Sequence, residues 1–468
     1  MKRYSNYEFI CARWYNQIPI HWHLIRIKDL ISQSNAGAWG DDPETDNGTI
    51  CLRVADMDFN LGVFKNKPVS VLTKRLYTEE QIEKLTLEQG DILIEKSGGG
   101  EKSPVGRSVY FDKSYPALFA NFMQRIRFKH KLIDAHFASY LLRTMYYRGA
   151  TWYYVKQTTG IQNLDLNSML AQERFPVPPH EEQDQIVRYL DWQVSKINRL
   201  IAAKRKEIAL LREQIQQTIT DVVYHGVDQT VNYQPVKMLY VDKIPEHWKC
   251  KRGKFLFAEH DIRSTDGKEE LLSVSHITGV TPRSQKNITM FKAESLVNYK
   301  ICRKNDIAAN TMWMWQGAIA VSSYHGVISP SYNTYHQIDN AYDSAYLDYM
   351  LRSKPLVDEY YVRSTGIRKS RLRLYPEQLL DMFFPVPPVE EQKRIAAVIA
   401  EKTQAANDFI AAIEKQIEKI NEFRVRMISD VVTGQVDVRG IKVPDDEYIN
   451  NEITEEEFEE ESENNEEE

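Results

Sequence analysis

The stretch FPVPPHEEQ at residues 175–183 decides the fold of this chain, because it occurs twice. It returns as FPVPPVEEQ at residues 384–392, an offset of 209 residues. The tripeptide DVV at 221–223 recurs at 430–432 with the same offset, so residues 175–228 align with 384–437 without a gap. A period of this kind indicates that the chain is built from repeated structural units.

A second duplicated motif lies upstream of each copy. IPIHW at residues 18–22 matches IPEHW at 244–248, an offset of 226 residues, with Ile20 replaced by Glu246. From Pro19 to Phe175 is 156 residues and from Pro245 to Phe384 is 139, so the first intervening region is 17 residues longer. The order is therefore a variable region, a shared block, a different variable region and a second shared block.

The shared blocks predict two long helices. Each proline pair can precede a helix but not lie inside one, and the two glutamates that follow favour a helix N-terminus. Apolar residues then recur in steps of three and four, the heptad pattern of a helix that packs against another helix. About 43 residues at 1.5 Å each give a rod of roughly 65 Å. The expected core positions are Ile197, Ile201, Lys204, Ile208, Leu211, Ile215, Thr218 and Val222 in the first copy, and Ile410, Ile413, Ile417, Ile420, Arg424, Met427 and Val431 in the second.

The two helices are each other's expected partners. Two copies of one unit in a single chain indicate a pseudo-twofold axis, and an axis perpendicular to the helices makes them antiparallel. This arrangement predicts the variable regions at opposite ends of one rod. The alternative is that each helix packs on a globular core, but the heptad pattern persists over several turns and occurs twice.

Both variable regions are expected to be α+β. Residues 90–94, 109–111, 305–308 and 319–321 have the β-branched or small apolar composition of short strands, and two of these segments follow a turn signal. Residues 140–142 and 346–351 are expected to be helical. The predicted fold class is thus two α+β domains joined by two long antiparallel coiled-coil helices with an internal pseudo-twofold repeat.

Composition places the chain among soluble globular proteins. Its 468 residues and 54.6 kDa suggest two to four domains, and 42% of the residues are apolar and 27% charged. No apolar run reaches the roughly 20 residues that cross a bilayer, and no secretory signal follows Met1. The four cysteines are widely spaced, which disfavours a zinc ribbon and favours a reducing, cytoplasmic location.

The net charge of −6 conceals a strong asymmetry. Residues 445–468 hold 14 of the 66 acidic side chains and no basic one, so the remaining chain has 60 basic against 52 acidic residues. Runs of like charge are usually disordered and solvated. We expect a disordered acidic tail, and the alternative is a tail that competes with DNA for a basic surface.

Catalytic motifs are missing from the sequence. Residues 97–103 resemble a phosphate-binding loop, but Glu101 stands where a glycine is needed and would repel phosphate. GxSxG and HExxH motifs do not occur, nor does a methyltransferase tetrapeptide of the Asn-Pro-Pro-Tyr type. His21 and His23 could suggest a metal pair, but the second copy has Lys249 in place of His23, so packing is the favoured interpretation. The sequence therefore predicts neither a catalytic nor a metal site.

Basic residues interleaved with aromatic residues and glycines suggest DNA binding instead. Arg and Lys neutralise phosphates or read guanine, Asn and Gln read adenine, and glycines allow backbone amides to approach phosphates. One cluster surrounds residues 125–131, and any single cluster could equally be a solvated surface. Trp313 and Trp315 could equally be core residues. The candidate DNA-binding residues are Lys96, Ser97, Gly98, Gly99, Lys102, Arg107, Asn310, Trp315, Gln316, Arg368, Lys369 and Arg371.

On the two doubled motifs, the doubled DVV and the two dissimilar regions between them, the chain resembles a specificity subunit of a type I restriction-modification system. The likeness extends to about residue 440, and segments 96–100, 305–307 and 315–317 resemble parts of the family's target-recognition domains. The acidic tail is not a feature that we associate with this family. The resemblance implies the domains 1–178 (first target-recognition domain), 179–227 (first spacer helix), 228–387 (second target-recognition domain), 388–440 (second spacer helix) and 441–468 (tail).

The resemblance also implies the partners and the absence of catalysis in this chain. Members of the family bind double-stranded DNA, two modification subunits and restriction or translocase subunits, and they act in phage defence in the cytoplasm. They hold no cofactor themselves, whereas S-adenosylmethionine, ATP and Mg²⁺ are expected in the partners. A bipartite, asymmetric DNA target is expected, because two unlike readers on one rod must touch two unlike half-sites. The alternative function is a coiled-coil scaffold whose end domains bind protein.

Overall fold

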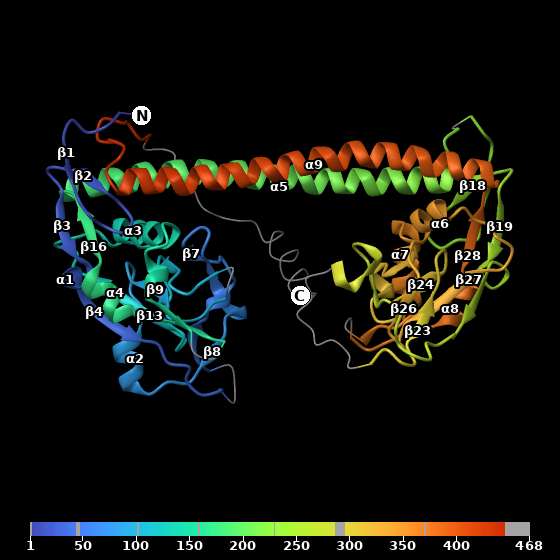
Figure 1. The fold of residues 1–468 in the computed structure, drawn as a ribbon, viewed down its shortest axis with the longest axis horizontal. Coiled ribbons are helices and arrows are strands. Elements are labelled where there is room, and N and C mark those ends of the chain that lie inside the picture. The colour runs from blue at the N-terminus through green and yellow to red at the C-terminus, as the bar shows by residue number, and fades with distance from the viewer. Residues whose placement is uncertain are drawn as a thin grey trace. The chain divides into compact units, whose positions relative to one another are not determined.

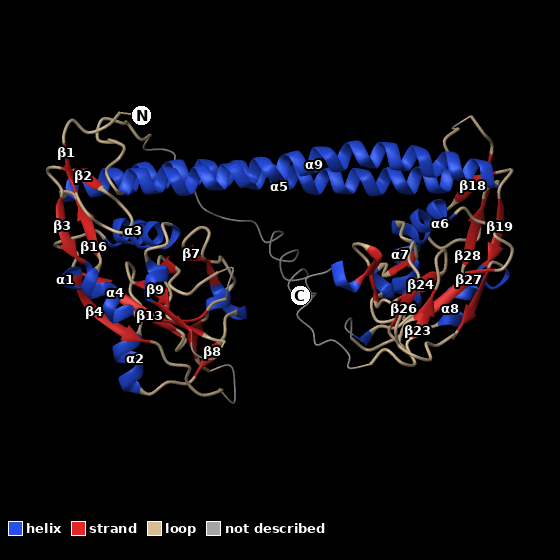
Figure 2. Ribbon diagram, in the orientation of Figure 1, coloured by secondary structure: helices blue, strands red, loops and turns tan. Residues whose placement is uncertain are grey.

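The structure is a computed structural model that describes residues 2–43, 47–100, 103–157, 160–228, 230–285, 295–368 and 371–444. It divides into two compact units. Unit 1 holds Met1–Ala203 and the segment that begins at Gln416, and unit 2 holds Lys204–Lys415. Each unit mixes helices with short strands (Figures 1 and 2), so the predicted α+β class is confirmed.

Unit 1 is organised around a four-stranded antiparallel sheet in the order β11-β9-β13-β4 (Ser108–Tyr110, Ile92–Glu95, Met123–Phe128, Ile31–Ala36). Along β9, Ile92 and Ile94 join one apolar core, while Leu93 joins a second core on the opposite face. Successive side chains of a strand point to opposite faces, so this sheet is buried on both sides. Helix α3 (Ala135–Tyr147) lies in the first of these cores.

The remaining strands of unit 1 form smaller sheets. The second core includes the sheet β12-β5-β8 (Ala117–Phe119, Thr49–Leu52, Lys74–Arg75), in which β12 and β5 are parallel. A third sheet has the order β10-β15-β14 (Ser97–Gly98, Gln162–Leu164, Val155–Gln157). The other elements are β1 (Tyr7–Phe9), β2 (Gln17–Pro19), β3 (His23–Arg26), α1 (Ile27–Leu30), β6 (Met57–Asp58), β7 (Val63–Phe64), α2 (Glu79–Leu85), α4 (Leu166–Gln172) and β16 (Arg174–Val177).

Unit 2 has its own four-stranded antiparallel sheet in the order β20-β27-β24-β25 (Phe257–His260, Asn333–Gln337, Ile307–Ala309, Ile319–Val321). Helices α6 (Ser344–Leu351) and α7 (Lys354–Arg363) contribute to its main core. The strands and helices predicted in both variable regions are present, with ends shifted by one to several residues. The other elements are β17 (Tyr233–Pro235), β18 (Lys243–Pro245), β19 (Lys249–Arg252), β21 (Leu272–Ser275), β22 (Gly279–Pro282), β23 (Lys300–Cys302), β26 (Gly326–Ile328), α8 (Pro376–Asp381) and β28 (Phe383–Val386).

The two predicted long helices are α5 (His180–His225) and α9 (Val389–Val432). In unit 1 the first half of α5 packs against the last half of α9, and Arg424 Nη1 donates to Asn198 Oδ1 at 2.7 Å. In unit 2 the last half of α5 packs against the first half of α9, and Arg212 Nη2 lies 3.4 Å from Glu414 Oε1. Within each unit the helices are antiparallel, and the predicted heptad positions are buried or half-buried while most residues between them are exposed.

The duplicated motifs pair with each other inside each unit. In unit 1 the Phe-Pro-Val strand β16 runs antiparallel to β3, which follows the His-Trp pair, and in unit 2 β28 pairs in the same way with β19. In unit 1, Trp22 Nε1 donates to Glu182 Oε1 at 3.1 Å and His21 Nε2 lies 2.8 Å from Glu182 Oε2. Unit 2 repeats this geometry at 3.1 and 2.8 Å with Trp248, His247 and Glu391. The His-Trp pair therefore anchors the start of each long helix, in agreement with the packing interpretation.

The glutamine of each Glu-Glu-Gln motif fixes the short helix that packs beside the long one. Gln183 is fully buried, accepts from the backbone N–H of Asp134 at 2.7 Å and donates to the carbonyl of Pro178 at 2.9 Å. Gln392 bonds Asp343 and Pro387 in the same manner, at 2.7 and 2.8 Å. Asp134 and Asp343 are the N-caps of α3 and α6, so this glutamine joins helix to helix in both units.

No helix in the described ranges is both long and apolar enough to span a membrane.

Candidate nucleic-acid interface

The glycine-rich loop of unit 1 is built into the sheet β10-β15-β14. Lys96 is half-buried, its N–H donates to the carbonyl of Phe122 and its carbonyl accepts from Leu164, each at 2.8 Å. Gly98 and Gly99 have φ angles of +117° and +61°, a region that side chains with a Cβ rarely adopt. A Cβ on Gly99 would lie 2.8 Å from the backbone nitrogen of Val105. Gly98 and Gly99 therefore suit backbone conformations that other residues rarely adopt, and there is no room for a side chain at Gly99. Lys102 lies outside the described residues.

Arginine residues near this loop are engaged inside unit 1. Arg107 forms two bonds to the buried Glu95, at 2.8 and 2.9 Å, and its guanidinium lies 4.0 Å from the centre of the Phe59 ring. In the cluster at 125–131, Arg125 is 2% exposed and donates to carbonyl and amide oxygens, and Arg127 pairs with Asp91 at 2.7 Å. Their charges neutralise carboxylates or satisfy backbone groups. Both guanidinium groups of this cluster are therefore engaged by other groups of unit 1.

The candidate residues of unit 2 include a buried asparagine that bonds other residues of the unit and aromatic side chains that are partly exposed. Asn310 is 4% exposed and donates to Tyr332 Oη at 2.9 Å and to the carbonyl of Val274 at 3.3 Å, so it fixes the following loop. Trp315 is half-buried, stacks on Trp313 with ring centres 5.9 Å apart and lies 6.2 Å from the ring of Tyr361. The two tryptophans are thus neither core residues nor fully exposed.

Gln316 ends the short 3-10 helix Met314–Gln316, which packs on α7. Its Oε1 atom is buried without a hydrogen-bond partner in the described part of the chain. Such groups are rare in folded proteins and are expected to find a partner when a ligand binds. Gly317 next to it has φ of +89°, and a Cβ there would lie 2.9 Å from Val357 Cγ2. The close packing on α7 places this amide at a defined position.

The basic loop of unit 2, which runs from Thr365 to Arg373, holds the exposed candidate arginines. Thr365 and Arg373 form an isolated antiparallel bridge, and both Arg368 and Arg371 are exposed between them. Tyr361 of α7, which contacts Trp315, precedes this loop by four residues. Through Tyr361, the loop that contains Trp315 therefore lies near the start of the basic loop in unit 2. Lys369 lies outside the described residues.

Sequence reasoning missed a group of aromatic side chains in unit 1. Tyr147, Trp152 and Tyr153 are 40%, 50% and 68% exposed; Tyr147 ends α3, and Trp152 and Tyr153 lie in the short 3-10 helix Thr151–Tyr154 that precedes β14. Exposed aromatic residues beside basic loops are platforms for nucleic-acid bases. The run Trp152-Tyr153-Tyr154 was visible in the sequence, but the exposure of Trp152 and Tyr153 was not.

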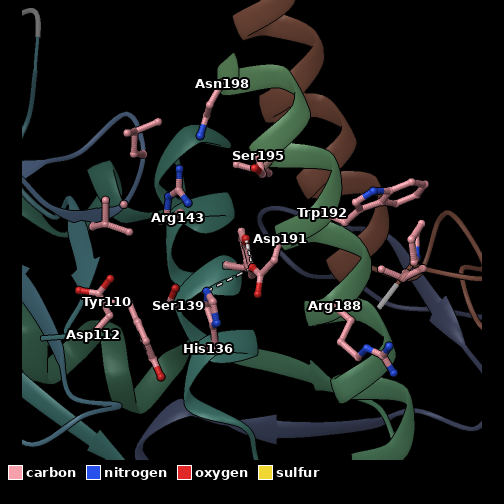
Figure 3. Close-up of a pocket in the computed structure, with 17 residues that line it drawn as sticks. Tyr110, Asp112, His136, Ser139, Arg143, Arg188, Asp191, Trp192, Ser195 and Asn198 are labelled. Carbon is pink, nitrogen blue, oxygen red and sulfur yellow. Dashed lines mark hydrogen bonds and ion pairs between the residues drawn. The ribbon is translucent and has the colours of Figure 1, made fainter. Parts of the chain in front are cut away.

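Unit 1 also contains a pocket of about 200 Å³ between α3 and α5, lined in part by His136, Tyr140 and Asp191 (Figure 3). The His136 ring is stacked between Tyr110 and Tyr140, with centres 4.5 and 5.2 Å away. Tyr140 Oη donates to Asp191 Oδ1 at 2.7 Å, and His136 Nε2 lies 3.5 Å from the same oxygen. Burial raises the pKa of Asp191 above its ordinary value.

This raised pKa predicts how the stability of unit 1 depends on pH. The folded carboxyl group binds its proton more tightly than the unfolded one, so unfolding releases a proton between the ordinary pKa of about 4 and the raised value. The contribution of Asp191 to stability therefore decreases as pH rises through this window. Asp191→Asn should remove this slope, and urea unfolding at pH 4 to 7 should show the variant gaining stability relative to the wild type as pH rises. An equal difference at every pH would contradict the prediction.

No set of three or more His, Cys, Asp and Glu side chains in the described ranges is arranged to bind a metal ion. Unit 1 instead combines a glycine-bearing loop with exposed aromatic side chains, and unit 2 combines a glycine-bearing loop with exposed arginines and half-buried tryptophans. These groups can contact phosphates and bases.

Comparison with known proteins agrees with this geometry. Residues 19–210 match the family model of the type I restriction modification DNA specificity domain. The chain is 22% identical over 442 residues to the putative type I restriction enzyme MjaX specificity subunit of Methanocaldococcus jannaschii, covering 90% of this chain and 95% of that protein. It is 26% identical over 206 residues to the MjaVIII specificity subunit of the same organism, covering 41% and 43%.

The fold is also found among solved structures. A chain from a structure described as "Structural basis underlying complex assembly and conformational transition of the type I R-M system" aligns with a TM-score of 0.53 at 14% identity, covering 90% of this chain and 99% of that one. The match to the DNA specificity domain lies in the N-terminal part of unit 1 and extends to residue 210 of α5. Residues 19–210 thus match the DNA specificity domain of type I restriction-modification systems, and over 90% of its length the chain is similar to a putative type I specificity subunit.

Proposed function

We propose that this chain recognises a bipartite, asymmetric DNA target and directs methyltransferase and restriction subunits to it. The observation that supports this most strongly is the repetition of the anchoring motifs around two α+β units whose other sequences differ. The repeated motifs attach the two variable regions to the long helices in the same way. Because the variable regions differ in sequence, they are expected to recognise different half-sites. A scaffold that binds protein with its end domains has no comparable support from the specificity domain.

The proposed division of the chain follows the repeat. Residues 1–178 and 228–387 are the two target-recognition domains, 179–227 and 388–440 are the spacer helices, and 441–468 are an acidic tail. The spacer helices would form an antiparallel coiled coil that sets the separation of the two half-sites. In this arrangement the helices determine the length of the spacer between the half-sites, and the variable regions determine which bases are recognised in each half-site.

The proposed DNA contacts come from both domains. In the first, Lys96, Ser97, Gly98 and Gly99 would contact the duplex, with Lys102 added from the sequence, while Arg107 positions this loop through Glu95. In the second, Trp315, Gln316, Arg368 and Arg371 would contact DNA, with Lys369 added from the sequence. Asn310 would act as a positioning residue, because its amide already bonds Tyr332. Phosphate contacts should dominate affinity, and base contacts should determine the sequence.

Two modification subunits are the proposed partners, together with restriction or translocase subunits. The equivalent positions Leu200 and Phe409, 209 residues apart, leave apolar side chains 48% and 51% exposed on the long helices. Apolar residues exposed at both repeat-related positions suit two copies of the same partner. The partners would bind S-adenosylmethionine, ATP and Mg²⁺, methylate adenine and operate in the cytoplasm, so that this chain holds no cofactor and performs no reaction.

Sequencing of DNA methylation in cells with and without this chain tests the proposal. We expect a methylated motif with two different half-sites that disappears when the chain is absent. The purified chain should bind duplex DNA with a strong dependence on salt and should methylate nothing until a modification subunit is added. Methylation or cleavage by the chain alone, or duplex binding that is independent of salt, would contradict the proposal.

Removal of the two exposed arginines from the basic loop should weaken DNA binding by unit 2. Arg368→Ala combined with Arg371→Ala should reduce affinity for duplex by about tenfold or more and lower the slope of log K against log salt by about two, because two phosphate contacts are lost. Lys402→Ala with Lys415→Ala, which removes two exposed charges from α9, is the matched control. Equal salt slopes for the two double variants would eliminate this loop from the interface.

A further inference from the structure

The two variable regions share a tripeptide that lies outside the repeated anchoring motifs. Thr-Gly-Ile occurs at residues 159–161 and again at 365–367, an offset of 206. The isoleucine is exposed in both units, to 52% at Ile161 and to 100% at Ile367. An exposed apolar side chain is common at a single surface position, but the same one at corresponding positions of two otherwise unlike domains indicates a shared contact.

The local backbone presents each isoleucine at a turn. In unit 1 the strands β14 and β15 pair antiparallel, and Gly160, with φ of +82°, lies in the segment that connects them. In unit 2 the bridge between Thr365 and Arg373 closes the loop that contains Gly366 and Ile367. A buried tyrosine stands five residues before the threonine in both copies, at Tyr154 (4% exposed) and Tyr360 (0% exposed).

Both turns adjoin the proposed DNA contacts of their own unit. Directly after Ile161, Gln162 and Asn163 pair with Gly98 and Ser97 of the glycine-rich loop, and Ser97 Oγ donates to Asn163 Oδ1 at 2.7 Å. Directly after Ile367 comes the exposed Arg368. In both units the exposed isoleucine is therefore next in sequence to a proposed DNA contact or to a residue that pairs with one.

We propose that Ile161 and Ile367 are matching apolar contacts to the duplex, one in each half-site, that enter the minor groove without reading its sequence. Residues that read bases must differ between two domains with different half-sites, whereas identical residues fit what both half-sites share. The minor groove presents a largely degenerate pattern, and isoleucine is among the side chains that enter it and separate base steps. This inference rests on the proposed DNA-recognition function and assigns a base-independent part of the same interface.

The test uses the full chain assembled with its modification subunits and two duplexes, one with the methylated motif and one with scrambled half-sites. The variants are Ile161→Ser and Ile367→Ser. The matched controls are Ile82→Ser on α2 of unit 1 and Ile338→Ser of unit 2, whose side chains are 39% and 47% exposed. Affinity is measured at several salt concentrations, and 2-aminopurine placed in each half-site reports separation of base steps by its fluorescence.

Each variant should bind both duplexes about tenfold more weakly, with the ratio between the duplexes and the salt slope unchanged, because no base reader and no charge is removed. The 2-aminopurine signal should fall in the half-site of the altered unit alone, and the controls should bind as the wild type does. Wild-type affinity in both variants would overturn the inference, and so would a loss confined to the motif duplex or a loss of the modification subunit with duplex binding retained. If the wild-type complex itself fails to prefer the motif duplex, the proposed function fails instead.

Discussion

Removal of residues 204–210 from α5 and 415–421 from α9 is expected to shorten the spacer of the methylated motif while both half-sites stay the same. Seven residues correspond to about 10 Å of helix, and a base pair to about 3.4 Å, so the spacer should lose up to about three base pairs. The first deleted segment lies between Asn198 and Arg212 in α5, and the second lies between Glu414 and Arg424 in α9; Asn198 pairs with Arg424 in unit 1, and Arg212 pairs with Glu414 in unit 2. Because a heptad is removed from each helix, the apolar positions on either side remain aligned.

Methylome sequencing of cells that express the double deletion measures this result. The control is a deletion in α5 alone, which shifts one set of apolar positions past the other and should reduce stability rather than shorten the spacer. Changed bases in either half-site would refute the proposed division between helices and variable regions. An unchanged spacer in a folded, active double deletion would show that the helices do not set the separation.

Gln183→Leu is expected to destabilise the docking of α3 on α5 by about 3 kcal/mol or more. The variant keeps the approximate volume of the side chain but leaves the N–H of Asp134 and the carbonyl of Pro178 without partners. Each buried polar group left unpaired costs about 1–3 kcal/mol. Gln392→Leu should have the same effect on α6 in unit 2, because its bonds to Asp343 and Pro387 are equivalent.

Hydrogen exchange suits this measurement, because a chain of two units need not unfold in a single step. Amide protection in α3 should fall in the Gln183 variant while α6 is unaffected, and the Gln392 variant should show the reverse. Gln217→Leu, at an exposed position of α5, makes the same chemical change and should alter neither. Loss of protection in both units from one variant would contradict the independence of the two anchors.

The duplication made most of the fold predictable. The proline pairs, the glutamates and the heptad positions predicted where both long helices begin and which residues they bury, because these signals are local and periodic. The strands at 307–309 and 319–321 were predicted from their composition. What the sequence did not show was the use of the repeated Glu182 and Gln183, whose partners lie far away in the chain.

The candidate interface was less predictable, because an arginine has the same sequence signal whether it contacts a carboxylate or a phosphate. Arg368 is exposed, whereas Arg107 is paired with Glu95, only twelve residues away, in a strand pairing that sequence periodicity does not reveal. The exposure of Trp152 and Tyr153 likewise depends on the packing around them.

By itself the sequence determined the doubled plan, the long antiparallel helices that this plan predicts and the family resemblance, because motifs that recur in the same order around two regions of similar length are expected to perform the same structural roles. Only the tertiary structure decided which polar side chains are exposed and which are paired inside a unit. The energy of a buried charge depends on the groups around it, and these groups come from segments that are distant in the chain. The pairing of Arg127 with Asp91 and the exposure of Ile367 are both results of that packing.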